Sequence, residues 1–368
     1  MKLIIKKKDI LIKILQIITR ILEKKQTLPI LENVLIKSIK KKLFFLSTNI
    51  NIQIITYIKL EEENNNLYIT VNGKKLLNIL KSFSKNKNIF LKIKNKKLIL
   101  KSKNSKFSLQ IINPKNFPII KEIKNFNFKF KITQKKLKKL FNMVYFAMAQ
   151  QDIRPYLNGV LLKIKNNKIY TVATDGYRLA IYKEKINNNL FKKSIIIPKK
   201  TIIQLQYLLK DIDSLVKIKI YENKIKFIFL KIKLISKLIK GKYPDYKSII
   251  PNNKILIIIN RKKLLKSLER ISILTSENFQ GVQWIIKNNF LKLFSINSLQ
   301  ETSEEIINIK YIGKTLKIGF NINFLLDVLN NLNSKEINFF LNKNINSSIL
   351  INIPNKKKFF YIIMPMYI

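Results

Sequence analysis

The chain has 368 residues, 47% of them hydrophobic, and its 72 Lys and Arg against 21 Asp and Glu give a formal net charge of +51. This composition excludes a disordered chain, and the length suits about three domains of ordinary size. Lys or Asn interrupts every Ile-rich run well short of the roughly 20 apolar residues that span a bilayer. Because Cys and a secretion-signal pattern are also absent, we expect a cytoplasmic protein with no membrane partner.

Three segments of the chain share one pattern of apolar and polar residues, in which Val34, Val160 and Val282 are equivalent. These valines are 126 and 122 residues apart. A period this long indicates a repeated domain.

In chain order, each copy is predicted to begin with a short strand and an amphipathic helix, followed by two strands and then by a second, similar half. In the second copy the predicted helix lies within residues 128–148, where apolar residues follow the i, i+3, i+4 spacing of one buried face. The helices of the second halves are predicted at 71–80, 197–205 and 320–329. Six short helices and many strands result.

Proline-containing linkers repeat with the same period, at Pro118, Pro244 and Pro365. They place the domains at 1–126, 127–254 and 255–368. Such two-half units predict an α+β fold, with helices on one side of antiparallel sheets. A row of these units leaves one sheet edge free at each end, and joining two copies into a closed ring removes both edges.

The charge predicts attraction to polyanions, nucleic acid above all. Lys, Asn and Ile are enriched throughout the chain, however, so the charge does not locate a site, and a drifted, solvated basic surface is an alternative for any single Lys. Catalysis is disfavoured because His and Cys are absent and the seven glycines form no phosphate-binding motif. We therefore expect no enzyme, no cofactor and no metal. A carboxylate metal site, as in a nuclease, remains as the catalytic alternative.

Six segments resemble the bacterial sliding clamp, the β subunit of DNA polymerase III. They lie at 27–35, 151–182, 238–251, 274–282, 319–332 and 361–368, in the family's order and along the whole chain. The resemblance implies three similar clamp domains per chain, two chains head to tail as a homodimer, helices lining a central hole and sheets outside. It also implies a processivity factor that encircles double-stranded DNA without sequence preference and tethers the polymerase III catalytic subunit, with clamp-loader subunits as further partners.

The resemblance implies DNA contacts at Lys25, Lys74, Gln151 and Tyr156. Pairs of cations also begin the predicted helices, at 72–75, 134–136, 198–200 and 260–263. Cations at the positive end of the helix dipole are unfavourable, which favours a functional reason over the alternative that such pairs are common in a Lys-rich chain. The chain departs from the family at Pro155, where an aromatic residue is usual, and at Gln280 and Gln283, where many clamps have Arg.

A cleft between the second and third domains is also implied, where short peptides with a Gln and two apolar side chains bind. Apolar walls, adaptable Met and a few polar anchors suit several such ligands. The alternative is that these residues are simply core. Tyr177 and Tyr367 stand where His and Arg are common. The matching residues are Leu157, Thr174, Gly176, Tyr177, Arg178, Leu179, Pro244, Ile249, Phe324, Ile362, Met364, Pro365 and Met366.

The third implied site is the dimer interface, with an apolar centre between opposite charges. For its acidic stretch, a solvated loop is the alternative. The matching residues are Lys75, Lys106, Phe107 and Leu109 on one side and Ile273, Leu274, Glu301, Glu304 and Glu305 on the other.

Two other classes of function stay open from the residues alone. The first is a sequence-blind protein that coats DNA or RNA from one face, and the second is a metal-dependent nuclease.

Overall fold

The computed structural model describes residues 2–5, 8–22, 28–61, 67–83, 89–102, 105–121, 125–186, 192–275, 280–342, 344 and 347–367. The chain forms two compact units, and each is described by itself. The first unit combines Met1–Lys135 with Ile203–Leu238, and the second combines Lys136–Ile202 with Ile239–Ile368. The domain boundaries predicted at 126 and 254 stay predictions. In the described part of the chain, no helix has both the length and the apolar character needed to cross a membrane.

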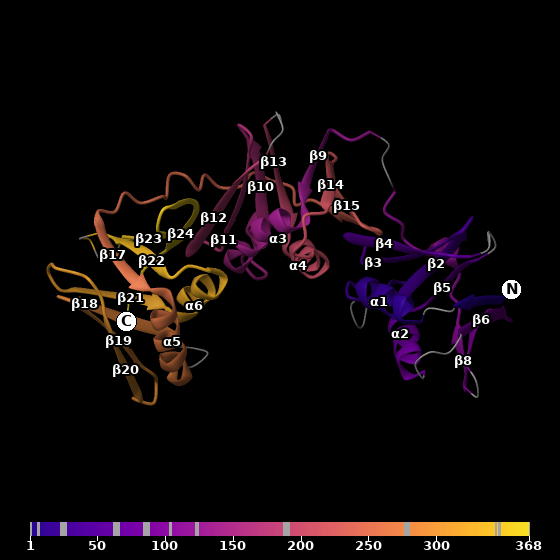
Figure 1. Cartoon of the computed structure of the whole chain (residues 1–368), viewed down its shortest axis with the longest axis horizontal. Coiled ribbons are helices and arrows are strands. Elements are labelled where there is room, and N and C mark those ends of the chain that lie inside the picture. Colours follow the sequence, from indigo (N-terminus) through magenta and orange to yellow (C-terminus); the bar gives the residue numbers. More distant parts are fainter. Residues whose placement is uncertain are drawn as a thin grey trace. The chain divides into compact units, whose positions relative to one another are not determined.

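The first unit contains two antiparallel sheets, with two helices against them. Helix α1 (Lys8–Thr19) contacts α2 (Gly73–Ser82) and strands β3 and β4, on one face of the larger sheet (Figure 1). Burial alternates in the first half of β3, where Leu43 and Phe45 are buried while Phe44 is half-buried. The larger sheet has the order β5 (Tyr68–Asn72), β2 (Asn33–Ile39), β3 (Lys42–Thr48), β4 (Ile52–Lys59), β16 (Ile232–Lys237), β15 (Lys224–Phe229), β14 (Leu215–Ile220), β9 (Phe128–Thr133), and the smaller has β1 (Lys2–Ile5), β6 (Ile89–Lys94), β7 (Lys97–Ser102), β8 (Ser105–Gln110).

The second unit repeats this plan. It contains the helices α5 (Arg261–Ile271) and α6 (Ile322–Asn331). Helix α3 (Gln134–Asn142) begins in the first unit and ends in the second, and α4 (Lys199–Leu208) begins in the second unit and ends in the first. The larger sheet has the order β13 (Lys193–Pro198), β10 (Gly159–Lys165), β11 (Lys168–Thr174), β12 (Arg178–Lys185), β24 (Lys356–Ile363), β23 (Ile349–Ile353), β22 (Glu336–Leu341), β17 (Ile255–Asn260), and the smaller has β20 (Thr302–Asn308), β19 (Phe290–Ile296), β18 (Gly281–Lys287), β21 (Leu316–Asn321).

Both larger sheets continue from one predicted domain into the next. Strand β4 pairs with β16 from Thr56–Ile232 to Ile52–Ser236, and β12 pairs with β24 from Arg178–Ile363 to Tyr182–Phe359. Each predicted domain junction is therefore a backbone ladder of hydrogen bonds. The antiparallel sheets and the helices against them confirm the predicted α+β class.

Helix α3 is shorter than its apolar spacing predicts. It ends at Asn142, because Val144 has φ of −136°, outside the helical range, and a 3-10 turn follows at Tyr145–Ala147. Val144 and Met148 are nevertheless buried, as predicted. The apolar period therefore locates the buried face correctly but not the end of the helix.

Asparagine side chains cap three helices. Asn72 accepts a hydrogen bond from the Lys75 backbone N–H at 3.0 Å, Asn260 from that of Lys263 at 3.1 Å, and Asn321 from that of Asn323 at 3.0 Å. The first turns of these helices contain no acidic residue. A neutral cap satisfies the free N–H groups without adding a negative charge, so the positive field of each helix start is retained.

Candidate functional site

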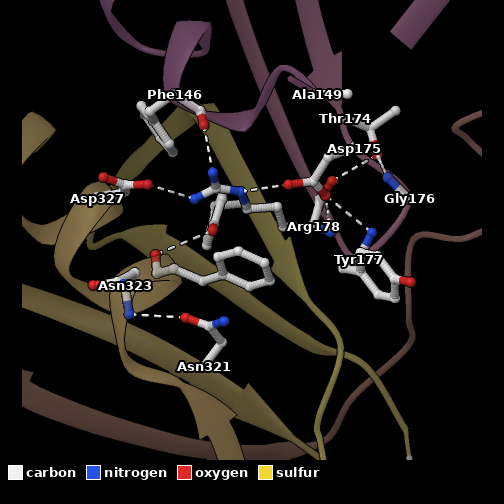
Figure 2. Close-up of polar contacts among 12 residues, drawn as sticks. Phe146, Ala149, Thr174, Asp175, Gly176, Tyr177, Arg178, Asn321, Asn323 and Asp327 are labelled. Carbon is white, nitrogen blue, oxygen red and sulfur yellow. Dashed lines mark hydrogen bonds and ion pairs between the residues drawn. The ribbon is translucent and has the colours of Figure 1, made fainter. Parts of the chain in front are cut away.

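A tight turn between β11 and β12 organises one part of the predicted cleft (Figure 2). Asp175 Oδ1 accepts hydrogen bonds from the backbone N–H groups of Tyr177 at 3.0 Å and Arg178 at 3.1 Å. Gly176, between Asp175 and Tyr177, has a φ of +100°, a backbone conformation that other residues rarely adopt. The Thr174 hydroxyl donates to the Arg178 carbonyl at 2.6 Å and accepts from the Gly176 N–H at 3.1 Å. The turn is thus held by its own side chains and presents Tyr177 outward, 66% exposed.

The Arg178 guanidinium is bound on three sides (Figure 2). It donates to Asp175 Oδ2 at 2.9 Å, to Asp327 Oδ2 of α6 at 2.6 Å and to the Phe146 carbonyl at 2.6 Å. It also lies 4.3 Å from the ring centroid of Phe324. Only 9% of the Arg178 side chain is exposed. The planar fork suits this arrangement, since one guanidinium can bind several acceptors at fixed angles.

These contacts keep Arg178 charged although it is buried. Burial by itself lowers the pKa of the guanidinium, but the carboxylates of Asp327 and Asp175 oppose burial, and the pKa lies above its ordinary value. Tyr361 is fully buried and donates its hydroxyl hydrogen to the Phe324 carbonyl at 3.1 Å. Burial raises the pKa of this phenol, so it remains a neutral donor.

An apolar cluster lies beside the turn, on one face of the larger sheet. Leu179 and Ile362, both predicted cleft residues, pack there with Tyr243 and Tyr246 of the linker that contains Pro244. Burial raises the pKa of both linker phenols. The two tyrosines therefore fasten the linker to the sheet, and exposed Pro244 lies between them in sequence.

The C-terminal residues of the predicted cleft are attached through their backbone. The Met364 N–H donates to the Tyr177 carbonyl and the Met366 N–H to the Gly319 carbonyl, each at 2.9 Å. Met364 is 50% exposed, whereas Pro365 and Met366 are half-buried. The exposed residues Met364 and Tyr177 are thus joined through their backbones.

The described contacts join eight of the predicted cleft residues: Thr174, Gly176, Tyr177, Arg178, Phe324 and Met364 around the turn, and Leu179 with Ile362 in the apolar cluster. They do not join Leu157 or Ile249 to these residues. Leu157 is buried, and its carbonyl accepts from the Ala149 N–H at 3.1 Å. Ile249 is 53% exposed further along the linker, and none of the described contacts joins it to the others.

Five contributing residues are missed by the sequence reasoning, namely Phe146, Tyr243, Tyr246, Asp327 and Tyr361. A signal existed for Asp327, which is the single acid of α6 and lies one turn after Phe324. The aromatic pair that flanks Pro244 was a second signal.

The predicted DNA contacts fall in separate parts of the chain. Lys25 lies outside the described residues. Lys74 is half-buried in the first turn of α2, in the first unit. Gln151 is exposed with φ of +55°, and Tyr156 is half-buried against the cleft's apolar cluster, both in the second unit. The position of Tyr156 therefore places its ring beside the cleft as well.

One lysine at a helix start, Lys199, is less available to an external phosphate than the sequence suggests. Lys199 Nζ donates to the Ala149 carbonyl at 3.3 Å, and the side chain is half-buried. Burial, reinforced by Arg178, lowers its pKa. Lys75, Lys262 and Lys263, by contrast, are exposed.

Most of the predicted interface residues lie at or near two sheet edges, whereas Lys75 lies in the first turn of α2. Strand β8 ends the smaller sheet of the first unit; it exposes Lys106 and, at 38%, Phe107, while Leu109 is buried. The Phe107 ring centroid lies 5.5 Å from that of Phe83.

Strand β20 is the edge of the smaller sheet in the second unit. Its acids are already paired within the chain: Glu304 with Lys292 at 2.6 Å and Glu305 with Arg270 at 2.5 Å. Glu301 accepts a hydrogen bond from Asn297 at 2.6 Å.

Close to this edge, Ile273 is 78% exposed. Leu274 is half-buried, and its carbonyl accepts a hydrogen bond from Asn297 at 3.2 Å.

Comparison with known proteins covers the whole chain. Family models of the DNA polymerase III beta subunit match in order: the N-terminal domain at residues 1–121, the central domain at 131–245 and the C-terminal domain at 247–367. The beta sliding clamp of Buchnera aphidicola subsp. Acyrthosiphon pisum is 38% identical over 357 residues, 97% of each chain. The crystal structure of DNA polymerase III subunit beta from Pseudomonas aeruginosa matches with a TM-score of 0.94 and 33% identity over 100% of both chains. A P. aeruginosa sliding clamp bound to griselimycin matches equally, with a TM-score of 0.94 and 33% identity over 100% of both chains. The chain belongs to the family of DNA polymerase III beta subunits, the beta sliding clamps.

Proposed function

We propose that this chain is a replication processivity factor that encircles double-stranded DNA and tethers the replicative polymerase to it. The observation that carries the proposal is the match to sliding clamps over the full length of the chain, with all three domains in order. A binding module grafted onto another protein would match over one domain only. Because the proposed partner is chromosomal DNA, we place the protein in the cytoplasm.

The ring is proposed to be a homodimer, closed where β8 of one chain pairs with β20 of the other. Two free sheet edges support this, because an unpaired edge is a template for another strand. The exposed side chains of Phe107 and Ile273 lie at these two edges and would be buried by the pairing. Lys75, Lys106, Leu109, Leu274, Glu301, Glu304 and Glu305 complete the proposed interface.

DNA contact is proposed to be electrostatic and independent of sequence. Lysines contact phosphates without reading bases, which holds the duplex while allowing it to slide. Lys25, Lys74, Gln151 and Tyr156 are the proposed contacts, with the exposed lysines at the helix starts as further ones. The neutral asparagine caps support this, since each leaves the helix start positive.

The partner site is proposed at the cleft around Arg178, for peptides of the polymerase III catalytic subunit and the clamp loader. Leu179 and Ile362 supply an apolar floor, and Met364 supplies a side chain that can repack for different ligands. The relative bound to griselimycin supports a ligand site in this family.

We propose no catalytic step for the chain itself. Within the described residues, no group of three or more His, Cys, Asp or Glu is placed to hold a metal ion. Encirclement and tethering require only binding.

The proposal is tested by topology. The protein is loaded onto nicked circular DNA with a clamp loader, and the DNA is then linearised. We expect retention on the circle and loss from the linear ends. A protein that stays on both forms binds a surface and does not encircle DNA, and degradation of the DNA in magnesium would instead indicate a nuclease; either result overturns the proposal.

A further inference from the structure

The face of the first unit's larger sheet that points away from its helices carries a second surface. Ile36 and Phe45 line a small apolar cavity together with Leu11 of α1, so their side chains point toward the helices. Side chains alternate along a strand, and Lys37 and Phe44 therefore point to the opposite face. We call this opposite face the outer face.

Four side chains form one row across the strands of this outer face. Tyr68 of β5 is paired with Lys37 of β2, Lys37 with Phe44 of β3, and Phe44 with Tyr57 of β4. The ring centroids of Phe44 and Tyr57 are 5.5 Å apart. We call these four residues the outer row. Three of its four members are aromatic.

Lysines lie over the rings of this row. Lys37 Nζ is 5.4 Å from the ring centroid of Tyr68, Lys42 Nζ is 5.0 Å from that of Tyr57, and Lys231 Nζ is 5.9 Å from the same Tyr57 ring. Each distance is within the range of a cation–π contact. Tyr68 is 41% exposed, and the three lysines are exposed as well. The surface therefore offers flat rings and cations side by side.

The lysines of the outer face repel one another. Lys42 of β3 is directly opposite Lys59 of β4, and both are exposed. Like charges in this arrangement destabilise a sheet. A bound polyanion would remove that cost, which indicates a partner with closely spaced negative charges.

A lysine-rich composition does not explain the rings. In the second unit the repeat places Lys163, Tyr170 and Lys183 in the equivalent row, with Ser194 at its end. Three aromatic residues are thus found in one copy and one in the other. Enrichment in lysine supplies cations to both copies, but it does not supply this concentration of rings to one.

The linker of the first unit contacts the outer row at its Tyr68 end, where the Tyr68 hydroxyl donates to the Pro114 carbonyl at 3.5 Å. Phe117 packs against Leu35 and Leu46, which lie on the same outer face two residues from Lys37 and Phe44. The Tyr68 side chain nevertheless remains 41% exposed.

From these observations we propose that the outer row binds single-stranded DNA, in addition to the duplex of the proposed function. Unpaired bases stack on aromatic rings displayed by an open sheet, while phosphates bind the neighbouring lysines. A duplex cannot use the rings, because its bases are stacked on each other. The lysines alone would not distinguish the two forms of DNA.

The test uses the full-length protein and dye-labelled oligo(dT), with fluorescence anisotropy over a range of salt concentrations. Tyr57→Leu with Tyr68→Leu removes two rings and keeps every charge; we expect about tenfold or more weaker binding with the same salt dependence. Lys37→Gln with Lys42→Gln keeps the rings; we expect weaker binding and a salt slope smaller by about 1.4, at roughly 0.7 per phosphate contact on single strands.

A matched control separates the outer row from general charge. Lys97→Gln with Lys101→Gln removes the same charge from exposed positions of β7 in the other sheet of this unit, and we expect at most a twofold effect. An equal loss in this control, or unchanged binding by the tyrosine variants, would overturn the proposal. Binding to anionic lipid vesicles but not to oligo(dT) would also overturn it. Retention on circular DNA is measured separately, so failure here leaves the proposed ring unaffected.

Discussion

Arg178 connects residues that are far apart in the sequence. Its partner Asp327 is 149 positions away, and its other acceptors lie on the turn before β12 and in the segment after α3. A buried cation with three acceptors and an aromatic neighbour costs much to disturb, because any group left behind is buried without its partner.

We expect Arg178→Lys to weaken peptide binding about tenfold and to destabilise the second unit by about 2–4 kcal/mol. Lysine keeps the charge but cannot bind Asp175, Asp327 and the Phe146 carbonyl in one plane. Fluorescence of Trp284, the single Trp of the chain, reports unfolding of this unit, and anisotropy reports peptide affinity. Arg270→Lys is the control, since the exposed Arg270–Glu305 pair is worth little and lies outside the predicted cleft. Equal behaviour of the two variants would contradict the prediction.

Glu305 provides a pH test. The hydrogen bonds from Arg270 lower its pKa below the ordinary value of 4.5, while partial burial opposes them and Ser267 assists. A carboxylate whose pKa is lowered by folding stabilises the protein fully above its unfolded-state value, and this contribution is lost as the pH falls through the folded-state value. Arg270→Gln is expected to raise the pKa of Glu305, measured by carboxylate NMR titration.

A reciprocal control is available for this test. Arg154 holds the pKa of Asp152 at about 2, chiefly through its side-chain hydrogen bond. Arg154→Gln should raise the pKa of Asp152 and leave that of Glu305 unchanged. A Glu305 pKa that does not respond to Arg270→Gln would exclude the ion pair as its cause.

At this scale the sequence could indicate Arg178 but not its environment. The resemblance to clamps marks the residues at 174–179, whereas the bond from Arg178 to Asp327 depends on the packing of α6 against a distant turn. The outer row was hidden for the same reason, because Lys37, Phe44 and Tyr57 become neighbours only through strand register.

At the scale of elements, helix starts with lysines but no acids are unfavourable for the helix itself. Lys262 and Lys263 in the first turn of α5 are exposed, so no local packing requires a cation there. Such an arrangement is expected where an external anion supplies the missing negative charge.

Replacing both residues, Lys262→Glu with Lys263→Glu, should therefore have two opposite effects. The helix is expected to gain about 0.3–1 kcal/mol per residue from the macrodipole, while retention on circular DNA falls. Thermal unfolding measures the change in stability, and the retention assay measures the change in binding to circular DNA. Lys310→Glu with Lys314→Glu makes the same change of charge outside a helix start and should leave retention nearly unchanged. If both pairs reduce retention equally, only net charge matters.

The apolar period located the helices well but their ends poorly. The predicted helix at 197–205 is observed as Lys199–Leu208, and that at 320–329 as Ile322–Asn331. The helix predicted within 128–148 ends early because Val144 leaves the helical conformation although its side chain stays buried. Burial is set by tertiary contacts, which an apolar period does not distinguish from helix continuation.

At the scale of the whole molecule, the proposed dimer interface requires that the Ile273 side chain become buried. This side chain is 78% exposed in the single chain, and burying an isoleucine contributes about 1.5–3 kcal/mol. Ile273→Asp should shift the dimer toward monomer, by tenfold or more in dissociation constant, as measured by analytical ultracentrifugation. Ile312→Asp, at a position 89% exposed in the connection between β20 and β21, should leave the mass unchanged. A stable dimer of the Ile273 variant would show that the dimer interface does not include Ile273.

The ladders from β4 to β16 and from β12 to β24 have a consequence for how the molecule opens. Amides that share a ladder are protected together, so a cooperative opening follows the sheets and not the repeats. Native-state hydrogen exchange should therefore group β10–β13 with β22–β24, and β14–β16 with β2–β4. The central domain would then be an evolutionary unit without being a unit of unfolding.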